Sequence, residues 1–187
     1  MKNQKANNTK KVLVGVCGSI AAYKICGLVR KLKEKGIDVK CILTPSAKQF
    51  ITPLTLQTLS NNTVYSDMFE LNLPEWKPEH ISLADWADLI VIAPATAATI
   101  SRLANGLADE LLSSVVLASK APVIICPAMN ANMWNHPANK ENAEKLSGFG
   151  YKFVGPETGE LACGVEGIGR LAAVDTILNK IISVLKK

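Results

Sequence analysis

The sequence predicts an α/β fold in which helices cover both faces of an open, mostly parallel sheet. Two observations favour this class. Short apolar runs alternate along the chain with helix-like runs, which is the pattern of successive strand–helix units. One of these runs, Leu89–Ala93, is apolar on both faces, as expected for a central strand of a parallel sheet. With 187 residues, the chain is long enough for one domain with a sizeable core.

The individual elements follow from the spacing of apolar residues and from the glycines, prolines and polar residues that bound them. Strands are expected at Lys11–Gly15, Ile37–Leu43, Leu89–Ala93, Val123–Cys126 and Tyr151–Val154. Helices are expected from Ser19 to about Lys35 and at Ala47–Ile51, Thr52–Leu59, Glu79–Asp88, Ile100–Ala104, Glu110–Lys120, Ala138–Leu146 and Asp175–Leu185. Residues 63–78 are expected to be irregular. Residues 155–171 contain five glycines in seventeen positions and are expected to form a long loop.

Composition narrows the functional classes. The chain is 48% hydrophobic and 20% charged, which is ordinary for a soluble globular protein. Four lysines lie in the first eleven residues and two more end the chain, so the net charge of +5 is largely terminal. With 5% aromatic residues, no nucleic-acid-binding stripe is predicted. No apolar run approaches the roughly 18 residues of a membrane span. Residues 1–9 are expected to be a disordered basic tail, and residues 10–187 the folded domain.

Cysteine usage indicates a reducing compartment. The five cysteines, Cys17, Cys26, Cys41, Cys126 and Cys163, include no C-x-x-C pair. The N-terminus is polar, unlike a signal peptide. These features predict free thiols and a cytoplasmic location. No metal site is predicted.

Glycine and hydroxyl residues follow the first two predicted strands. Gly15 and Gly18 permit a tight turn, and Ser19 can cap the next helix. Backbone N–H groups at such a turn bind anions, although an ordinary strand–helix turn explains the same residues. After the second strand, Thr44 and Ser46 could hold a phosphate or the polyol arm of a cofactor, or serve only as N-caps.

The stretch Pro127–Pro137 places a neutral amide, Asn130, between Met129 and Met133 where a strand ends and a helix begins. A neutral donor suits an anion that must later be lost as CO2. An arginine would hold the carboxylate more strongly in the ground state and oppose its loss. In the alternative interpretation, the methionines fill the core and Asn130 is a turn residue.

Small residues follow the strand that begins at Leu89. Ala95, Ala97 and Ala98 would let a flat ligand approach the backbone, and Thr96 and Thr99 supply hydroxyls. The four strand-end segments described so far would face one edge of the same sheet. This arrangement predicts a Rossmann-like (flavodoxin-like) domain that binds a nucleotide-like cofactor with a phosphate and a flat ring.

Two reactive side chains lie outside these segments. His80 lies near the start of a short predicted helix, and it is either structural or a proton-transfer residue suited to neutral pH. Cys163 lies in the glycine-rich segment of residues 155–171. If that segment closes as a lid, its thiol could act on a bound ligand. Otherwise the segment only connects to the last helix.

Several motifs together resemble one known family. They are Gly-Ser-Ile-Ala-Ala-Tyr-Lys at 18–24, His80, Ala-Pro-Ala-Thr-Ala-Ala-Thr at 93–99, Pro-Ala-Met-Asn-Ala-Asn-Met-Trp at 127–134 and Leu-Ala-Cys-Gly at 161–164. On these motifs the chain resembles the flavin-containing cysteine decarboxylase family. The resemblance implies FMN as cofactor, bound by Gly18, Ser19, Ile20, Thr44, Ser46, Thr96, Ala97, Ala98, Thr99 and Ala128. It implies substrate contacts from Asn130, Met133, Leu161 and Ala162, and catalytic roles for His80 and Cys163.

The resemblance also implies a reaction and an assembly. The reaction is the decarboxylation of 4'-phospho-N-pantothenoylcysteine to 4'-phosphopantetheine in coenzyme A biosynthesis, through flavin oxidation to a thioaldehyde, CO2 loss and re-reduction. Lys24, Arg102 and Arg170 are candidates for holding the substrate phosphate. The assembly is a homotrimer or dodecamer with active sites between subunits. The alternatives are a peptidyl-cysteine oxidative decarboxylase, a prenylated-flavin synthase and a non-catalytic flavoprotein regulatory subunit.

Two positions depart from the family pattern. Ala98 stands where the family commonly has asparagine, so it can offer a flavin only its backbone. Val165 stands where an aspartate often follows Cys-Gly. We therefore expect differences in cofactor contacts at the first position and in lid closure at the second.

Overall fold

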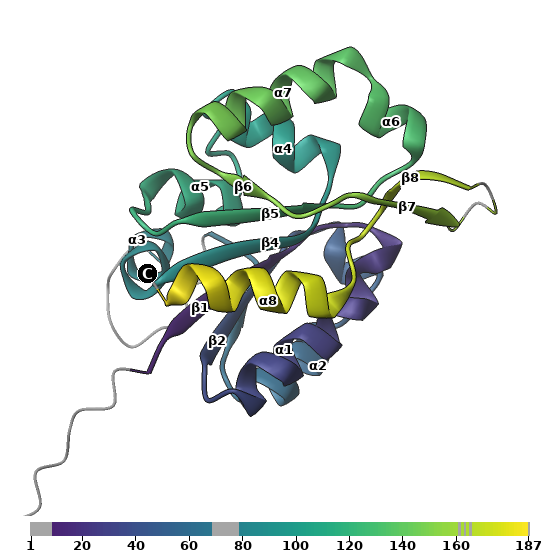
Figure 1. Ribbon diagram of the computed structural model, residues 1–187. Helices are drawn as coiled ribbons and strands as arrows, with labels where there is room; N and C mark the ends of the chain where they lie inside the picture. Colours follow the sequence, from purple (N-terminus) through teal and green to yellow (C-terminus); the bar gives the residue numbers. More distant parts are fainter. Residues whose placement is uncertain (1–8, 69–78, 161, 163, 165, 187) are drawn as a thin grey trace, which may run out of the picture.

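The computed structural model describes residues 9–68, 79–160, 162, 164 and 166–186. Its centre is a six-stranded sheet with the spatial order β3-β2-β1-β4-β5-β6, in which every neighbouring pair is parallel (Figure 1). The strands are β1 (Lys11–Val16), β2 (Asp38–Leu43), β3 (Val64–Tyr65), β4 (Leu89–Ala95), β5 (Val123–Pro127) and β6 (Lys152–Phe153). The strand order reverses between β1 and β4, which is where open α/β sheets bind ligands.

Helices cover both faces of the sheet, which confirms the predicted fold class (Figure 1). One face is covered by α1 (Ile25–Glu34), α2 (Pro53–Ser60) and α8 (Val174–Leu185). The other is covered by α3 (Glu79–Trp86), α4 (Ala97–Ala104), α5 (Leu111–Ala118) and α7 (Pro137–Gly148). Three short helical segments complete the helices: η1 (Ile20–Lys24), η2 (Ala47–Gln49) and α6 (Ala131–Asn135).

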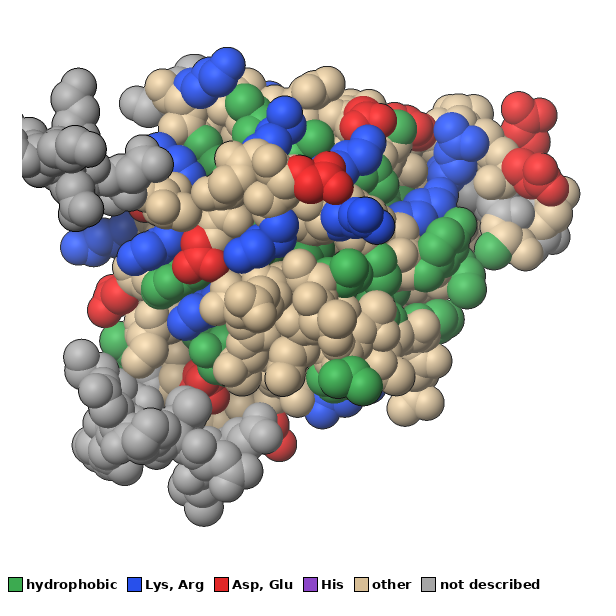
Figure 2. Space-filling view, turned by 90° about the horizontal axis from the view of Figure 1, so that it is seen from below, with side chains coloured by type: hydrophobic (Ala, Val, Ile, Leu, Met, Phe, Trp, Pro, Cys, Tyr) green, Lys and Arg blue, Asp and Glu red, His purple; other side chains and the backbone are tan. Residues whose placement is uncertain are grey.

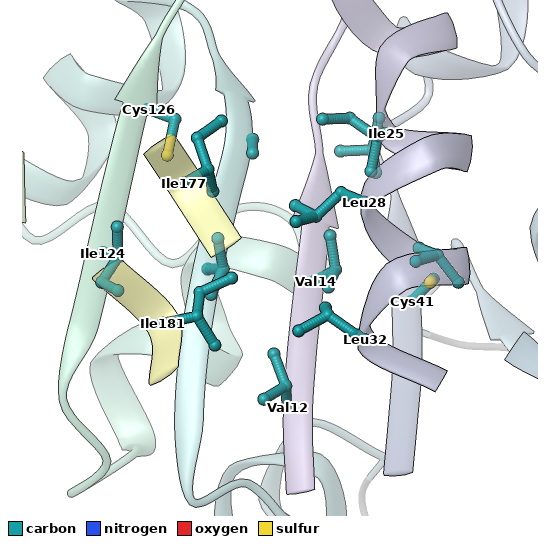
Figure 3. Close-up of a cluster of buried hydrophobic side chains, with 14 of the residues drawn as sticks. Val12, Val14, Ile25, Leu28, Leu32, Cys41, Ile124, Cys126, Ile177 and Ile181 are labelled. Atoms are coloured by element: carbon teal, nitrogen blue, oxygen red, sulfur yellow. The ribbon is translucent and has the colours of Figure 1, made fainter. Parts of the chain in front are cut away.

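Two apolar clusters hold these layers together, one on each face of the sheet. Successive side chains of a strand point to opposite faces, so Val12 and Val14 of β1 pack under α1 and α8, while Leu13 packs under α5. Figure 3 shows the first cluster, in which Leu28 and Ile181 reach the sheet from α1 and α8. Because the central strands are buried on both faces, their sequence shows continuous apolar runs rather than alternation.

The prediction of a long loop at residues 155–171 is wrong. These residues contain an antiparallel pair of strands, β7 (Glu157–Glu160) and β8 (Glu166–Arg170), which we call the hairpin. Gly159 pairs with Gly167, so two glycines face each other in this ladder. Glycine is unfavourable in strands in general, and the prediction followed that tendency. What stabilises this strand pair is a contact with a distant loop, described below.

Helix boundaries also differ from the predictions. The helix expected from Ser19 begins as the 3-10 segment η1 and becomes α-helical only at Ile25, and residues 47–51 form little more than one 3-10 turn. Helix α4 begins at Ala97, three residues earlier than expected, because the Thr96 side chain caps it. Among the described residues, no helix is long and apolar enough to cross a lipid bilayer.

Candidate functional site

The loops that follow β1, β2, β4 and β5 meet at the carboxyl edge of the sheet. Backbone hydrogen bonds continue between them beyond the strands. The Cys17 N–H donates to the Pro94 carbonyl (3.2 Å), and the Thr44 N–H donates to the Val16 carbonyl (3.0 Å). The Ala128 N–H donates to the Ala95 carbonyl (3.0 Å). The structure therefore brings together the four segments that the sequence analysis assigned to one edge.

Gly18 is where the first two of these loops touch. A Cβ atom at Gly18 would collide with Cβ of Ser46 and lie 3.0 Å from the Ser46 carbonyl carbon. Beside it, the Ser19 hydroxyl accepts a hydrogen bond from the Ala21 N–H (3.4 Å), and the Thr44 hydroxyl accepts one from the Ala47 N–H (3.3 Å). The N-cap interpretation therefore holds for Ser19, whereas Thr44 lies two residues before Ser46, the N-cap residue of η2. Ser46 makes no capping hydrogen bond, and it is exposed.

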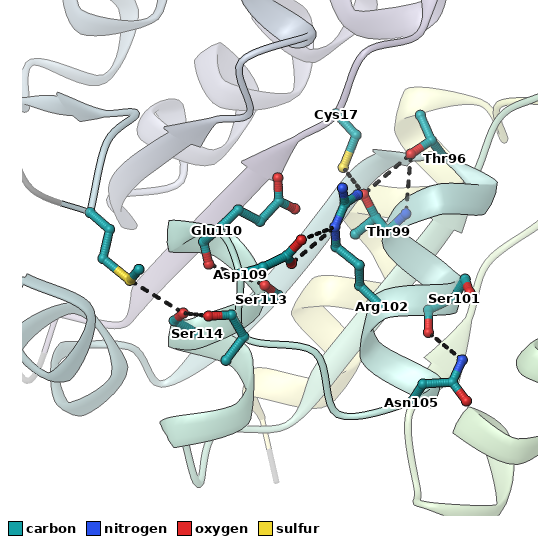
Figure 4. A network of polar contacts seen from close by, with 12 residues as sticks. Cys17, Thr96, Thr99, Ser101, Arg102, Asn105, Asp109, Glu110, Ser113 and Ser114 are labelled. Carbon is teal, nitrogen blue, oxygen red and sulfur yellow. Dashed lines mark hydrogen bonds and ion pairs between the residues drawn. The ribbon is translucent and has the colours of Figure 1, made fainter.

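Helix α4 begins beside this contact with a small hydroxyl network (Figure 4). The Thr96 hydroxyl accepts a hydrogen bond from the Thr99 N–H (3.3 Å), and the two threonine hydroxyls lie 3.2 Å apart. The Thr99 hydroxyl donates to the Cys17 thiol sulfur (3.2 Å). Burial raises the pKa of Cys17 to about 11, so its thiol is protonated at neutral pH. Ala97 and Ala98 form the first turn of α4, where free N–H groups favour anions.

A cavity of about 580 Å³ adjoins these loops. Its lining combines three parts of the chain: the start of η1, the loop after β5, and the hairpin with the residues that follow it. The lining residues are Ser19, Ile20, Ala21, Tyr23, Lys24, Ala128, Met129, Asn130, Glu160, Ala162, Gly169, Arg170 and Leu171. Three predicted cofactor contacts, Ser19, Ile20 and Ala128, therefore share this cavity with predicted substrate contacts. The other predicted cofactor contacts do not line it; they are Gly18, Thr44, Ser46, Thr96, Ala97, Ala98 and Thr99.

Asn130 lines this cavity with its amide already oriented. Its side-chain oxygen accepts a hydrogen bond from the Asn132 N–H (2.8 Å) and so caps α6. Asn130 is therefore a turn residue, as the alternative interpretation of the sequence had it, and this hydrogen bond fixes the oxygen end of its amide. The side-chain nitrogen keeps two N–H donors for a ligand, which is the arrangement that suits a carboxylate.

Met129 is held from two sides, by residues that the sequence analysis missed. Its N–H donates to the Gly169 carbonyl of β8 (3.0 Å). Its sulfur accepts a hydrogen bond from the side-chain amide of Asn139 in α7 (3.3 Å), and Asn139 is 6% exposed. Gly169 permits the first contact because it has no side chain. A Cβ atom at this position would overlap the Met129 carbonyl oxygen. The only signal in the sequence is the repeated glycines of the hairpin, because glycine in a strand often marks a place where another backbone segment comes close.

Other predicted site residues lie elsewhere. His80 is half-buried in α3, which lies at the opposite end of the molecule from the hairpin, and it does not line the cavity (Figure 1). Met133 in α6 is 50% exposed and does not line it either. Ala162 does line it. Leu161, Cys163 and Val165 lie outside the described residues.

A second, smaller cavity of about 160 Å³ lies beside Thr44 and includes Glu110. The Glu110 Oε1 atom is buried without a hydrogen-bond partner in the described structure. Burial raises the pKa of this carboxyl, the Asp109 carboxylate adds to the rise, and the Arg102 guanidinium opposes it. The Arg102 Nε donates to both Asp109 oxygens (3.0 and 3.2 Å), so Arg102 faces this region and not the large cavity (Figure 4).

Comparison with known proteins gives close relatives over almost the whole chain. A bifunctional coenzyme A biosynthesis protein, CoaBC, from Bacillus subtilis is 50% identical over 172 residues, which are 92% of this chain and 42% of that protein. A probable phosphopantothenoylcysteine decarboxylase from Streptococcus mutans is 47% identical over 92% of this chain and 97% of its own. The chain spans less than half the length of the bifunctional relatives that it matches.

Solved structures include proteins of the same kind as these sequence relatives. A PPC decarboxylase mutant in complex with pantothenoylaminoethenethiol superposes with a TM-score of 0.85 at 30% identity, covering 96% of this chain and 100% of that one. The FMN-dependent cysteine decarboxylase SpaF gives a TM-score of 0.80 at 29% identity, covering 94% and 97%. The family model described as Flavoprotein matches residues 1–186. The chain therefore belongs to the flavoprotein family.

Proposed function

We propose that the protein uses FMN to decarboxylate 4'-phospho-N-pantothenoylcysteine to 4'-phosphopantetheine, a carbon–carbon lyase step of coenzyme A biosynthesis in the cytoplasm. The observation that carries the proposal is the cavity that Asn130 lines together with Ser19 and Ile20, with the Asn130 oxygen held by the Asn132 N–H. The Streptococcus mutans relative, which this chain matches over 97% of its length, supports the choice of substrate.

The loops at the carboxyl edge fit a flavin nucleotide. Gly18 lets the loop that carries Ser46 lie against the turn after β1, and Ala97, Ala98 and Ala128 add little bulk at this edge. The first turn of α4 and the exposed Ser46 hydroxyl would hold the phosphate and the polyol arm. When bound, the flavin supplies the oxidation of the cysteine side chain that makes CO2 loss possible, and it returns the electrons afterwards.

Asn130 would bind the substrate carboxylate through its two free amide N–H groups. A neutral donor stabilises the carboxylate less than a cation would, so less of that stabilisation has to be lost when CO2 leaves. The Met129 contacts fix the loop, so the amide is in place before substrate binds.

Proton transfer would be carried out by His80 and Cys163, the roles implied by the family resemblance. Because His80 lies outside the cavity of its own chain, it would reach the reaction only from a second copy. This supports an active site between subunits of a homotrimer, alone or assembled as a dodecamer. Cys163 would protonate the enethiol so that the electrons can return, and an unperturbed thiol with a pKa of about 8.5 carries that proton at neutral pH.

The test is a paired assay on purified protein. The visible spectrum reports bound flavin, and mass spectrometry identifies products from phosphopantothenoylcysteine for wild type and Cys163→Ser. We expect wild type to release phosphopantetheine and Cys163→Ser to accumulate a product two hydrogens lighter. If wild type itself stops at the enethiol, the chain is a peptidyl-cysteine-type oxidative decarboxylase. If it binds flavin and releases no CO2, it is a non-catalytic flavoprotein.

The shared active site has its own test. Co-expressed His80→Asn and Cys163→Ser chains would each be inactive alone. If His80 serves the cavity of a neighbouring copy, random mixing leaves about a quarter of the sites with both wild-type residues and restores that share of activity. Absence of any recovery in mixed oligomers would place both residues on one chain.

A further inference from the structure

The described lining of the large cavity carries two cations and one anion. Lys24 ends η1, Arg170 ends β8, and Glu160 lies at the far end of β7. The proposed substrate is an anion at both ends, with a carboxylate beside the reacting carbon and a phosphate on the pantothenoyl arm. Asn130 accounts for the carboxylate. The two cations are therefore free to serve the phosphate.

Arg170 is held across the hairpin so that part of its guanidinium is fixed and part is free. One terminal nitrogen, Nη2, donates to the Glu157 carboxylate (3.5 Å), and the Arg170 side chain is 45% exposed. The other nitrogens lie over Gly159, where a Cβ atom would be 2.8 Å from Nη1 and 3.2 Å from Nε. Gly159 leaves this space open, and Nε and Nη1 make no hydrogen bond in the described structure, so their charged N–H groups remain available as donors. Charge-assisted donors of this kind bind phosphate oxygens strongly.

Lys24 adds a second positive charge to the cavity lining, from the end of η1. Its ammonium group lies 6.0 Å from the ring of Tyr23, and the described carboxylates form no ion pair with it. Glu160 opposes both cations, but it is exposed and lies directly across the hairpin from Glu166. In the space-filling view, acidic side chains gather at the outer end of the molecule, with basic side chains beside them (Figure 2). Among the described lining residues the two cations outnumber the one carboxylate.

Arg102 can be excluded as the phosphate ligand. Its Nε donates to both Asp109 oxygens, and it does not line the large cavity. Its side chain is 33% exposed, comparable with that of Arg170, and it likewise forms an ion pair with a carboxylate. Arg102 is thus a matched control for Arg170.

We propose that Arg170 is a specificity residue that binds the substrate phosphate, with Lys24 as the second cation, so that the cavity prefers phosphorylated over unphosphorylated pantothenoylcysteine. This inference rests on the proposed function. The phosphate would lie at the hairpin end of the cavity, and the substrate would extend from there to Asn130. Because the phosphate does not react, its binding acts on substrate affinity, while the chemical step is served by other residues.

The test compares kcat/KM for phosphopantothenoylcysteine and pantothenoylcysteine on holoenzyme variants. We expect Arg170→Gln to lower the preference for the phosphorylated substrate by about 10- to 100-fold through KM, as loss of a charge-assisted pair of hydrogen bonds would. Its kcat/KM for pantothenoylcysteine should fall by much less than that for the phosphorylated substrate. Arg170→Lys should recover part of the preference, because it restores the charge without the planar fork. Arg102→Gln should retain the preference in full.

The variant Glu157→Gln distinguishes phosphate binding by Arg170 from a purely structural role of Arg170 in the hairpin. It removes the charge that pairs with Arg170 but keeps an oxygen that can accept from the Ala173 N–H, as Glu157 does now (3.1 Å). This variant should retain the phosphate preference. If Arg170→Gln lowers kcat/KM equally for both substrates, Arg170 only supports the hairpin and the inference is wrong. The same conclusion follows if the preference survives in Arg170→Gln.

A binding measurement keeps the inference separate from the proposed reaction. Calorimetry compares phosphopantothenate with pantothenate on the flavin-loaded protein. Tighter binding of the phosphorylated compound to wild type, lost in Arg170→Gln and kept in Arg102→Gln, supports the phosphate site even if no CO2 is released. Equal binding of the two compounds to wild type overturns the inference while leaving the decarboxylation assay to decide the reaction.

Discussion

A methyl group at Gly169 would collide with the backbone of the loop that carries Asn130. In Gly169→Ala, the new Cβ would overlap the Met129 carbonyl oxygen and lie 3.3 Å from its carbon and 3.4 Å from the Ala131 nitrogen. All three are backbone atoms, so no side-chain rotation relieves the overlap. Gly169 also has a φ of +144°, in the region that favours glycine. The substitution must therefore separate β8 from the loop.

Three effects contribute to the loss of stability. The backbone conformation costs about 1 kcal/mol for an L-residue. Overpacking costs about 1–3 kcal/mol, and loss of the hydrogen bond from Met129 N–H to Gly169 costs about 1 kcal/mol. We expect a total loss of about 3 kcal/mol or more, which lowers Tm by roughly 6–12 °C for a chain of this size.

Gly150→Ala is the matched control. Gly150 has a φ of +90°, but a Cβ there meets nothing within 4 Å. Gly150→Ala should therefore lower the free energy of unfolding by only the backbone cost of about 1 kcal/mol, which lowers Tm by roughly 2–4 °C. Thermal melts compare the two variants, and hydrogen exchange at the Met129 amide reports the contact itself. If Gly169→Ala melts within about 2 °C of Gly150→Ala, or if the Met129 amide stays protected, the contact does not hold the hairpin.

Three further predictions concern the cofactor loop, the carboxylate site and the buried carboxyl. Gly18→Ala should weaken FMN binding at least about 10-fold, because its Cβ would displace Ser46; fluorescence titration should find Gly27→Ala, which has open space, unchanged. Asn130→Asp keeps the capping oxygen but replaces the donor with an anion, so CO2 release should show kcat/KM lowered about 10- to 100-fold; an unchanged value would show that the amide does not bind the carboxylate. Burial raises the pKa of Glu110, so the contribution of this carboxyl to stability is fully present below its unfolded pKa of about 4.3 and is lost as pH rises through the folded pKa. Glu110→Gln should therefore gain Tm over wild type as pH increases from about 4 to 8, and a pH-independent difference would contradict this.

The parts of the fold that could be predicted are those with a local signal. Buried parallel strands show as apolar runs, and β1, β2, β4 and β5 begin and end within two residues of the predicted bounds. Capping residues are equally local, so Ser19 could be named as an N-cap before its hydrogen bond was known. Asn130 was found because a polar residue directly after a buried strand stands out in the sequence.

The hairpin could not be predicted, because its signal is not local. Gly167 and Gly169 favour a loop when the chain is considered alone. The strand β8 forms where its Gly169 carbonyl accepts from Met129, a residue forty positions earlier. Asn139 was missed for the same reason, since an asparagine in a helix gives no sign that it binds a methionine sulfur.

The sequence by itself determined the fold class, the edge at which the ligand loops gather and the chemistry of the residues on them. These depend on periodicity and residue type, which are properties of short segments. Only the tertiary structure decided that Lys24 and Arg170 face one cavity with Asn130, that Arg102 faces elsewhere, and that His80 lies outside the cavity. Such placement depends on contacts between segments far apart in the chain, and a charged side chain has the same sequence signal whichever way it points.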